Sequence, residues 1–514
     1  LMDQNNGGII GKINTPTTTL ASGVWSLDSQ FESQAGSTWP LAFPQTTIAN
    51  SLRFNKGSSD YLNRTFGTST STKKCTYSCW VKRSKLNDSG GQYLFTFNNT
   101  GSAIYFNGSG TGAGTNDELV INSDSNFAFY TDDLYRDVSA WYHIVVAVDT
   151  TQGTASNRVK IYVNNVQVTN FGTETYPSQN ADFNNLFSSS GVHEIGRGAA
   201  TGGTEYFGGY MAEVIFVDGQ QLEPTSFGVF NTVSNIWEPR PYAGTYGNNG
   251  FRLDFSDSSA LGDDVSGNGN DFTVNNLTSV DQSTDTCSNN FATINPLVRN
   301  KSYNDGSLAQ GNTYFAPGGR AISCSTIGVT KGKWYAEFKA QDAGALYIGC
   351  GQLRGIDALS DGGLTNPIWY DNNPGYAVGY GADGSLEDGT PSTSYGSGYS
   401  DNDIVGVALD MDNYEMYISV NGTFQNSGDP TSGSSKTGGV TGAISYNPFD
   451  DGFPIFFFVS DFSAAGVGEC FHNYGNPAFS ISSGNSDADG HGNFEYAVPS
   501  GYFALCTKNL AEYG

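Results

Sequence analysis

Positive charge is scarce in this chain of 514 residues. Lys and Arg together number 24 against 50 Asp and Glu, so the formal net charge at pH 7 is −26. Nucleic-acid binding requires clustered basic side chains that neutralise phosphates, and no basic stripe occurs here. The composition therefore excludes a nucleic acid as a partner.

Long apolar runs and targeting segments are also lacking. The most apolar run, residues 455–459, is far shorter than the ~20 residues of a membrane-spanning helix, so we expect no membrane insertion. Residues 1–6 have neither the basic nor the apolar region of a secretory signal, which predicts a protein made in the cytoplasm that does not use the general secretory route.

The cysteines lack the spacing of a zinc site and show no disulfide pattern. The seven Cys include no C-x-x-C pair, and their odd number leaves at least one thiol free. On one strand, Cys75 and Cys79 would have Cα atoms about 13 Å apart, too far for a disulfide. We interpret the cysteines as small buried residues of a protein made in a reducing cytoplasm.

Glycine and aromatic residues are abundant instead. The chain has 66 Gly, 13% aromatic residues and only 14% charged residues, against a typical charged share of ~25%. Large aromatic anchors supply apolar cores, while Ser, Thr, Asn, Gly and Tyr must make up most of the surface. With only four Met and few Lys, Glu or Leu, this composition predicts an all-β fold of sandwiches with long loops.

The pattern along the chain divides it into four segments. We predict an extended arm at 1–49, a first sandwich at 50–232, a linker rich in Gly, Asn and Asp turns at 233–296, and a second sandwich at 297–514. The arm has too few apolar residues for its own core, yet it carries two tryptophans, Trp25 and Trp39. These residues are our candidates for anchoring the arm on a neighbouring protein. A strand that closes the next domain is an equally weighted alternative.

Strand patterns are dense in the first predicted sandwich. The blocks are Ser-Cys-Trp-Val at 78–81, Trp-Tyr-His at 141–143, Lys-Ile-Tyr-Val-Asn at 160–164 and Gly-Tyr-Met-Ala-Glu-Val at 209–214. In order and spacing they resemble the laminin-G/concanavalin-A-like jelly roll. This resemblance implies an antiparallel two-sheet sandwich with a face capable of binding a ligand, and it names no ligand. The pair Asp218-Gly219, after an apolar strand, predicts a hairpin turn.

The predicted linker contains a string of oxygen-bearing side chains around glycines. Asp263, Asp264 and Asp271 alternate with Asn268 and Asn270, a composition that suits calcium. The string lacks the bidentate Glu of an EF-hand loop, so we predict a turn that caps itself through Asx hydrogen bonds. Calcium stays an open alternative, and we predict no other cofactor and no metal site.

Alternating strands resume in the last segment. The blocks are Gly-Lys-Trp-Tyr-Ala-Glu-Phe at 332–338, Tyr-Ile-Gly-Cys-Gly at 347–351, Asp-Ile-Val-Gly-Val-Ala-Leu-Asp at 403–410, Met-Tyr-Ile-Ser-Val-Asn-Gly at 416–422 and Ile-Phe-Phe-Phe at 455–458. This succession resembles the SPRY domain, which implies a second antiparallel sandwich. The fold class is therefore two antiparallel β-sandwiches, concanavalin-A-like and then SPRY-like, behind an N-terminal arm.

Carboxylate pairs for glycoside hydrolysis are missing from the sequence pattern. A glucanase of the concanavalin-A type would carry E-x-D-x-x-E on one strand, and no Glu here is followed two positions later by Asp. Glu213 and Asp218 are five apart and would face opposite sides of an extended strand. Asp410 and Asp412 share a face but lie in a predicted turn. Inverting enzymes can recruit carboxylates from distant strands, so that alternative stays open.

Nucleophilic catalysis finds no better support. His143 lies inside an apolar strand and is predicted to be a hydrogen-bonded core residue. His472 follows Cys470 by two, so the two share a strand face; packing is the favoured explanation and a thiolate–imidazole pair the alternative. We predict no catalytic residue and no enzymatic activity.

Binding is better supported, because loops rich in Tyr, Trp, Ser, Gly and Asn are typical of adaptable recognition surfaces. The candidates for ligand binding are Trp369, Tyr370, Tyr395 and Tyr399, whose rings could stack on sugars. The equally weighted alternative is that these rings cover the edge of the sandwich.

Stretches scattered over the whole chain carry one more resemblance. They are Gly-Ile-Ile-Gly-Lys-Ile-Asn-Thr-Pro-Thr at 8–17 with Gly-Val-Trp-Ser-Leu at 23–27, Gly-Phe-Arg-Leu-Asp-Phe at 250–255 with Ser-Gly-Asn-Gly-Asn-Asp-Phe at 266–272, Asn-Asn-Phe-Ala-Thr-Ile-Asn-Pro at 289–296, and Val-Pro-Ser-Gly-Tyr at 498–502 with Ala-Leu-Cys-Thr at 504–507. Together they resemble proteins of tailed marine bacteriophages.

This resemblance implies a structural protein at the virion surface, made in the host cytoplasm. The first hypothesis is a tail fibre or tail-associated protein that binds other virion proteins and a host-surface glycan or protein. The second is a capsid decoration or tail protein that binds virion proteins alone, and the third is a glycan depolymerase. By analogy with tail fibres we expect a homo-oligomer, although coiled-coil heptads are absent and the stoichiometry stays open.

Overall fold

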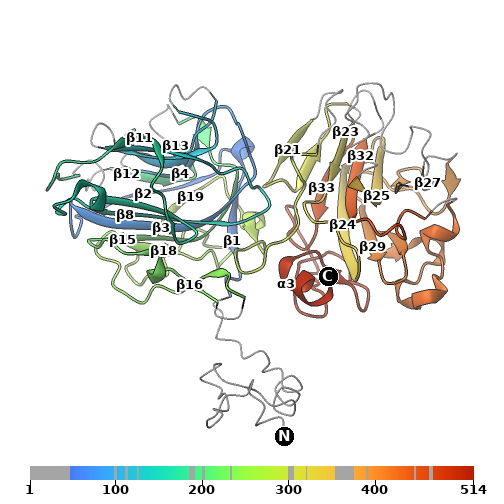
Figure 1. Ribbon diagram of the computed structural model, residues 1–514. Coiled ribbons are helices and arrows are strands. Elements are labelled where there is room, and N and C mark those ends of the chain that lie inside the picture. Colours follow the sequence, from blue (N-terminus) through green and yellow to red (C-terminus); the bar gives the residue numbers. More distant parts are fainter. Residues whose placement is uncertain are drawn as a thin grey trace, which may run out of the picture. The chain divides into compact units, whose positions relative to one another are not determined.

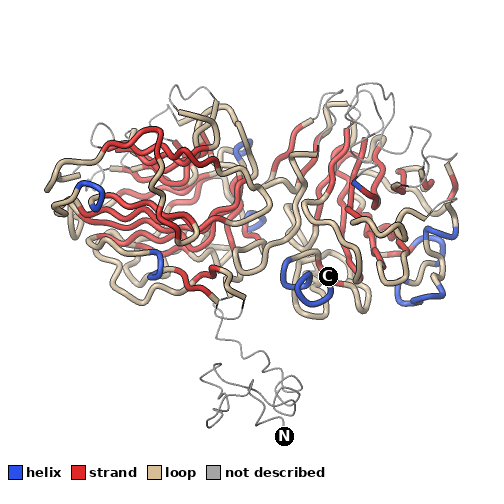
Figure 2. Tube along the Cα trace, viewed as in Figure 1, coloured by secondary structure: helices blue, strands red, loops and turns tan. Residues whose placement is uncertain are grey.

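The computed structural model describes residues 47–514 except 98–100, 110–113, 124–126, 184–190, 199–202, 232–233, 299–305, 320, 354–375, 389–391, 445–446, 462 and 464–466. The predicted arm, with Trp25 and Trp39, therefore lies outside the described residues except for 47–49. Strands dominate the described chain (Figure 1 and Figure 2). Its helices are α3 (Thr507–Tyr513) and the 3₁₀ turns η2 (Lys56–Ser58), η3 (Ala155–Asn157), η5 (Pro224–Ser226), η6 (Ser279–Asp281), η8 (Gln425–Ser427), η9 (Pro430–Ser435) and η10 (Val440–Gly442).

The first sandwich contains an eight-stranded sheet in the order β10-β9-β8-β3-β15-β1-β20, with β18 beside β15. Every pair in it is antiparallel. The strands are β1 (Ser51–Phe54), β3 (Lys74–Arg83), β8 (Tyr142–Asp149), β9 (Val159–Val163), β10 (Val166–Gln167), β15 (Gly209–Asp218), β18 (Phe251–Leu253) and β20 (Gln282–Ser283).

A second eight-stranded antiparallel sheet has the order β11-β7-β6-β5-β4-β12-β2-β19. Its strands are β2 (Tyr61–Thr65), β4 (Gln92–Thr96), β5 (Ala103–Phe106), β6 (Glu118–Ser123), β7 (Phe127–Leu134), β11 (Phe171–Thr175), β12 (Val192–Ile195) and β19 (Thr273–Asn275). A short hairpin of β13 (Arg197–Gly198) and β14 (Glu205–Tyr206) follows β12.

One apolar core joins these two sheets. It takes Val146 and Met211 from the first sheet and Ile121 and Ile195 from the second, all of them buried. Along β3, β5, β8 and β9 alternate residues point into this core, as period-2 patterning requires, so the two sheets face each other as a sandwich.

The second sandwich pairs an eight-stranded sheet, in the order β21-β22-β33-β24-β29-β30-β31 with β34 beside β24, with a six-stranded sheet in the order β23-β32-β25-β26-β27-β28. Its core takes Trp334 and Val407 from the larger sheet and Ile348 and Phe457 from the smaller one. The strands are β21 (Ser307–Ala309), β22 (Tyr314–Ala316), β23 (Ala321–Cys324), β24 (Lys333–Asp342), β25 (Leu346–Gln352), β26 (Ala377–Gly381), β27 (Ser385–Glu387), β28 (Thr393–Ser394), β29 (Ile404–Asp410), β30 (Glu415–Val420), β31 (Thr423–Phe424), β32 (Ile455–Asp461), β33 (Glu469–Asn473) and β34 (Phe503–Ala504).

These sheets confirm the predicted fold class of two antiparallel β-sandwiches. Residues 48–224 and 243–514, which contain both, form one compact unit. Strands β18, β19 and β20, from the segment predicted as a linker, are paired into the sheets of the first sandwich.

The other unit comprises residues 1–47 and 225–242. Its described part is a hairpin of β16 (Gly228–Phe230) and β17 (Trp237–Pro239). Phe230 packs edge-on against Trp237, with ring centroids 5.0 Å apart.

Two turns of the first sandwich differ in the way they end their strands. Asn164 and Asn165 both have positive φ and close the β9–β10 hairpin, as a two-residue turn of the primed type requires. Asp218 does not begin a hairpin, because its carboxylate accepts the backbone N–H groups of Thr70 and Asn249 at 2.7 and 3.1 Å. The side chain therefore fixes loops to the end of β15 instead of turning the strand back.

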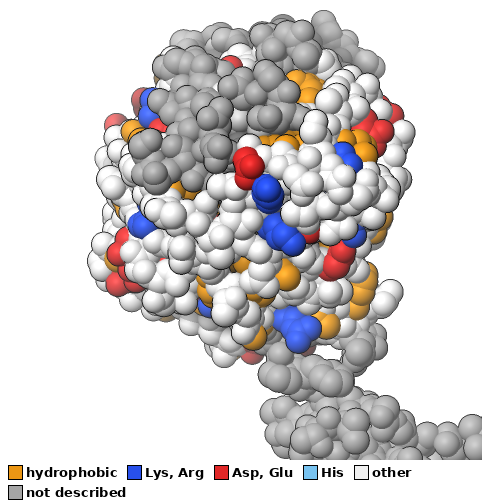
Figure 3. All heavy atoms as spheres, turned by 90° about the vertical axis from the view of Figure 1, so that its left-hand side faces the viewer, with side chains coloured by type: hydrophobic (Ala, Val, Ile, Leu, Met, Phe, Trp, Pro, Cys, Tyr) orange, Lys and Arg blue, Asp and Glu red, His pale blue; other side chains and the backbone are white. Residues whose placement is uncertain are grey.

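Buried thiols and a surface with few charged side chains agree with the composition. All seven cysteines are free, and six of them are buried. On the face of the molecule shown in Figure 3, charged side chains are scattered among uncharged polar groups and backbone wherever the residues are described. Among the described residues, no helix has both the length and the apolar character needed to cross a membrane.

A fully buried ion pair lies beside the first sandwich. Lys82 of β3 donates to Asp285 at 2.7 Å, and the two side chains are 1% and 0% exposed. Trp141 and the backbone N–H of Phe291 donate to the same carboxylate at 3.2 and 3.3 Å, while Lys82 also donates to Asn290. Both charges are thus saturated by hydrogen bonds, the condition for a buried pair to be tolerated.

Replacing Asp285 with Ala should destabilise the protein strongly, because it leaves the Lys82 ammonium buried without a counter-charge. We expect a loss of about 3–5 kcal/mol, measured by urea unfolding of the full chain. The matched control is Asp182→Ala: Asp182 is half-exposed and lies 3.8 Å from Lys73, so its loss should cost less than ~1 kcal/mol. Equal effects of the two substitutions would contradict this role of Asp285.

Asp60, just before β2, is buried, and only one of its carboxylate oxygens accepts a hydrogen bond. Its Oδ2 accepts the backbone N–H of Asn55 at 2.8 Å, and its Oδ1 has no hydrogen-bond partner. Burial raises the pKa of Asp60 from 3.8 to about 7. At a pH between these two pKa values, Asp60 is protonated in the folded state and ionised in the unfolded state. The stability contributed by Asp60 therefore falls as the pH rises from about 4 to about 7.

Asp60→Asn should remove this pH dependence, since the amide cannot ionise and its oxygen can still accept from Asn55. We expect a flatter stability profile and a gain on the order of 1–3 kcal/mol at pH 8, measured by thermal unfolding across pH. The exposed Asp450 supplies the control Asp450→Asn, which should leave the profile unchanged. If Asp60→Asn shows the same dependence of stability on pH as the wild type, Asp60 is not the source of that dependence.

Candidate ligand-binding face

The sheet that contains β4 to β7 has a second face, turned away from the core, which we call the outer face. Directly paired residues lie on the same side of a sheet. Tyr93 pairs with Tyr105, Tyr105 with Val120, and Val120 with Tyr130, so these residues form one row across four strands. They make up a separate apolar cluster, distinct from the main core.

The rings of this row are closely packed. Tyr93 and Tyr105 stack with their centroids 4.7 Å apart and an angle of 16° between their planes. Burial and then the nearby Glu205 raise the pKa of Tyr93, while burial and then Tyr130 raise that of Tyr105. Tyr93 and Tyr105 are 7% and 6% exposed, whereas Tyr130 is half-buried.

Two glycines leave room for Tyr93. A Cβ atom built on Gly91 or on Gly198 would lie 2.6 Å from atoms of the Tyr93 ring. The ring is therefore held between two backbone segments, with Tyr105 stacked beside it.

A second aromatic group lies farther along the same face. The guanidinium of Arg197 sits 4.6 Å from the centroid of the Tyr61 ring and 5.8 Å from that of Tyr206. Glu194 fixes this guanidinium through an ion pair of 3.1 Å. All three residues of the Tyr61–Arg197–Tyr206 group are half-buried, so part of the group faces solvent.

Two carboxylates of this face have uncommitted oxygens. Glu194, only 4% exposed, uses Oε1 for Arg197 and leaves Oε2 without a hydrogen-bond partner. Glu205 Oε2 is likewise buried and unpartnered. Burial raises the pKa of Glu194, and Arg197 opposes that rise. Both oxygens are buried in this structure, so a ligand that brings O–H or N–H donors would reach them only after neighbouring side chains move.

The spacing of the aromatic groups sets a length for a ligand. Tyr130 on β7 and Tyr61 on β2 are separated by five strand intervals in the sheet order. At ~4.8 Å per interval these half-exposed ends lie about 24 Å apart across the sheet. The buried Tyr93–Tyr105 stack fills the middle, so the face suits an extended ligand rather than a compact one.

The aromatic residues singled out from the sequence lie elsewhere. Trp369 and Tyr370 are outside the described residues. Tyr395 and Tyr399 are 6% and 3% exposed in the core of the second sandwich, and their hydroxyls donate to the carbonyls of Gly438 and Leu346. This burial favours the alternative in which the rings pack on the sandwich. A binding role for the four residues stays a prediction.

The carboxylates tested for catalysis serve the fold. Glu213 forms two hydrogen bonds of 2.8 Å with Arg252. It lies at a β-bulge, between Ala212 and Ile215, so the alternation assumed for an extended strand does not hold there. Asp410 accepts the backbone N–H groups of its own turn and pairs with Lys333 at 2.9 Å, which is the predicted turn chemistry.

The histidines of the two strands are core residues. His143 is buried, contacts the hydroxyl of Ser78 at 2.9 Å and stacks on Trp80, which confirms the prediction. His472 contacts the hydroxyls of Ser323 and Tyr474 at 3.2 and 3.0 Å. Burial lowers the pKa of both imidazoles to about 3, so they are neutral at physiological pH.

The candidate calcium string is hydrogen-bonded within itself. Asp264 accepts the backbone N–H groups of Arg252, Ser266 and Asn270 at 2.8–2.9 Å. These are the bonds of the predicted self-capped turn. In the part of the chain that the structure describes, no cluster of three or more His, Cys, Asp or Glu could hold a metal ion.

A comparison with protein families matches most of the first sandwich. Residues 56–223 match the protein family described as the Concanavalin A-like lectin/glucanases superfamily. This segment is similar to that superfamily. No curated protein matches the chain.

Solved structures with a similar fold include the SPRY domain of human HERC1, at 14% identity over 35% of this chain and 96% of that one, with a TM-score of 0.24. A candidate carbohydrate-binding protein from Bacteroides ovatus is 20% identical over 45% of this chain, with a TM-score of 0.32, and this chain spans 60% of its length. Another human SPRY domain is 16% identical over 33% of this chain and 94% of that one, with a TM-score of 0.22.

Gly198→Ala should disturb the outer face, because the added methyl group would overlap the enclosed Tyr93 ring. We expect a destabilisation of about 1–3 kcal/mol and an altered near-ultraviolet circular dichroism signal of the stacked tyrosines. In the control Gly153→Ala the new Cβ would meet nothing within 4 Å, so stability should stay equal or rise by up to ~1 kcal/mol. If Gly198→Ala and Gly153→Ala change stability and the circular dichroism signal equally, Gly198 does not position Tyr93.

Proposed function

We propose that this chain is a non-enzymatic binding protein whose first sandwich holds an extended, neutral glycan on its outer face. The observation that carries the proposal is the pair of half-exposed aromatic ends, Tyr130 and the Tyr61–Arg197–Tyr206 group, with unpartnered Glu194 and Glu205 oxygens on the same face. Aromatic rings offer flat apolar area to the C–H faces of sugars, and carboxylates accept their hydroxyls. The similarity of residues 56–223 to a superfamily of lectins and glucanases supports this class of ligand.

The charge of the face favours a neutral glycan over an acidic one. The uncommitted groups are carboxylate oxygens, which cannot donate a hydrogen bond to another anion. Arg197, a cation of this face, is already paired with Glu194. The net charge of −26 adds long-range repulsion of polyanions.

We propose binding without catalysis for two reasons. Glu213 and Asp410 are already hydrogen-bonded within the fold. His143 and His472 are buried. Release of reducing ends from a bound polysaccharide would overturn it and would favour the depolymerase alternative, with Glu194 and Glu205 as the carboxylates to test.

Substitution of the exposed aromatic ends tests the site. With the full chain, Tyr61→Ala and Tyr130→Ala should each weaken binding of a neutral oligosaccharide identified on a glycan array about three- to tenfold. Binding is measured by isothermal titration calorimetry. Tyr414 is exposed on the second sandwich, so Tyr414→Ala is the matched control and should bind as the wild type does.

Two results would contradict the proposal. One is wild-type affinity in both outer-face variants. The other is a preference for acidic over neutral polysaccharides on the array.

We further propose that the chain is a bacteriophage virion surface protein that uses this face on host glycans as part of a tail. The sequence stretches between 8 and 507 that resemble tailed marine bacteriophage proteins support it. A capsid decoration or a tail protein that binds virion proteins alone is the second candidate. Antibody labelling of assembled particles tests the location: label on the tail supports the first candidate, label on the capsid the second, and unlabelled particles refute both.

A further inference from the structure

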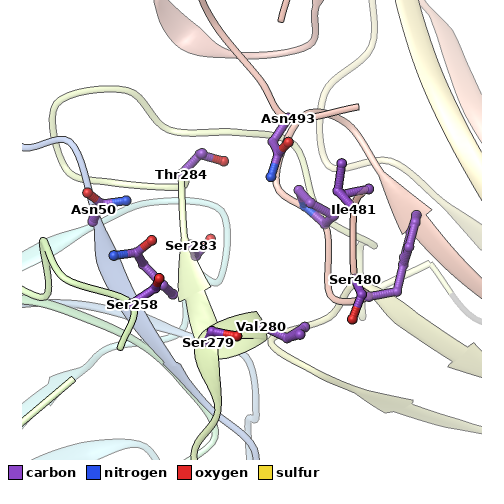
Figure 4. Close-up of a pocket in the computed structure, with 12 residues that line it drawn as sticks. Asn50, Ser258, Ser279, Val280, Ser283, Thr284, Ser480, Ile481 and Asn493 are labelled. Atoms are coloured by element: carbon purple, nitrogen blue, oxygen red, sulfur yellow. The ribbon is translucent and has the colours of Figure 1, made fainter. Parts of the chain in front are cut away.

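A polar pocket lies within the compact unit that contains both sandwiches, and the residues that line it differ from those of the outer face. Its volume is about 300 Å³, roughly the space of ten liquid water molecules and the small end of the ~300–1,000 Å³ range of ligand pockets. One wall comes from Asn50, Ser258, Ser279, Val280 and residues 282–284, and the other from Pro477, residues 479–481 and Asn493 (Figure 4).

The two walls are fixed to each other by buried hydrogen bonds. The Arg53 guanidinium, which is fully buried, donates to the carbonyl of Val280 at 2.7 Å and to that of Pro477 at 3.0 Å. Thr284 donates to the carbonyl of Gly475 at 2.6 Å. Because these bonds join the walls without a ligand, the pocket is preformed, and a ligand would not have to order it on binding.

Polar side chains line this pocket without partners of their own. Asn50, Ser258, Ser279, Ser480 and Asn493 face it (Figure 4), and their side chains form no hydrogen bond within the described structure. Each of them can both donate and accept. The lining contains no charged side chain, and Val280, Phe479 and Ile481 add apolar surface.

This chemistry selects among ligand classes. An ion would find no counter-charge, and an apolar molecule would leave several polar groups buried and unsatisfied. A hydroxyl group both donates and accepts, so a compact ring or chain of hydroxyl groups matches the uncommitted amides and hydroxyls, while its C–H surface can lie on Phe479 and Ile481. We propose that the pocket binds a neutral polyhydroxylated molecule of monosaccharide size, at a site separate from the outer face.

Binding is tested on the full chain by saturation-transfer NMR and calorimetry with glucose, galactose, mannose, N-acetylglucosamine and glycerol as probes. At least one probe should bind with a Kd in the millimolar range. The double variant Asn50→Ala/Asn493→Ala, which removes polar groups from both walls, should weaken that binding about tenfold. Ser480→Trp should abolish it by filling the pocket.

The controls separate this site from the proposed glycan site and from loss of folding. Ser486 is exposed and lies outside the pocket lining, so Ser486→Trp should bind the probe as the wild type does. Tyr130→Ala, which alters the outer face, should also keep it. All variants should unfold at the wild-type temperature, since the substituted side chains are exposed or half-buried.

Binding of a trisaccharide that contains the bound sugar shows whether the ligand is a free sugar or part of a glycan. Equal affinity for the monosaccharide and the trisaccharide indicates that the pocket binds the end unit of a glycan. Binding of the monosaccharide alone indicates a free sugar, and either result supports the proposed site. The proposal is overturned if none of the probes binds at concentrations up to about 50 mM, or if Ser480→Trp binds the probe as tightly as the wild type.

Discussion

The buried carboxylate of Asp285 is the contact on which the arrangement of the first sandwich and the following segment depends. It accepts from Lys82 of β3, from Trp141 before β8 and from the backbone of Phe291. Its own carbonyl accepts the hydroxyl of Ser51 in β1. One residue thereby ties three parts of the first sandwich to the chain that leads into the second. The cost of burying two charges makes this geometry specific, because any displacement would leave one of them unpaired.

Other buried polar side chains near Asp285 also join segments that are distant in the sequence. Arg53 joins the carbonyls of Val280 and Pro477, and Asn312 donates to the carbonyl of Ser84 at 2.9 Å. Each of these bonds links residues more than 190 positions apart in the sequence. Directional bonds of this kind require neighbouring loops to keep fixed positions, and the polar pocket between 279–284 and 477–481 is a consequence.

The sequence predicted the strands well and the outer face hardly at all. The predicted blocks at 78–81 and 141–143 lie in β3 and at the start of β8, because apolar patterning reports burial directly. Around Tyr93 the pattern misleads. A β-bulge between Tyr93 and Phe95 places these residues, two apart, on opposite faces, whereas regular alternation would place them together. The single Tyr on each of β4, β5 and β7 was the available signal, but only the strand register shows that these residues lie in one row.

The sequence by itself determined the properties that depend on composition and local pattern: the all-β class, the order of two sandwiches, the excess of negative charge, the self-capped turn at Asp264 and the core position of His143. Tertiary structure alone decided which residues meet. Glu194 and Glu205 come together with the tyrosines of the outer face, and 279–284 comes to line a pocket with 477–481, only through strand pairings and hydrogen bonds between distant segments. Local propensity carries no information on such pairings, because any strand can in principle pair with many others until the whole core is packed.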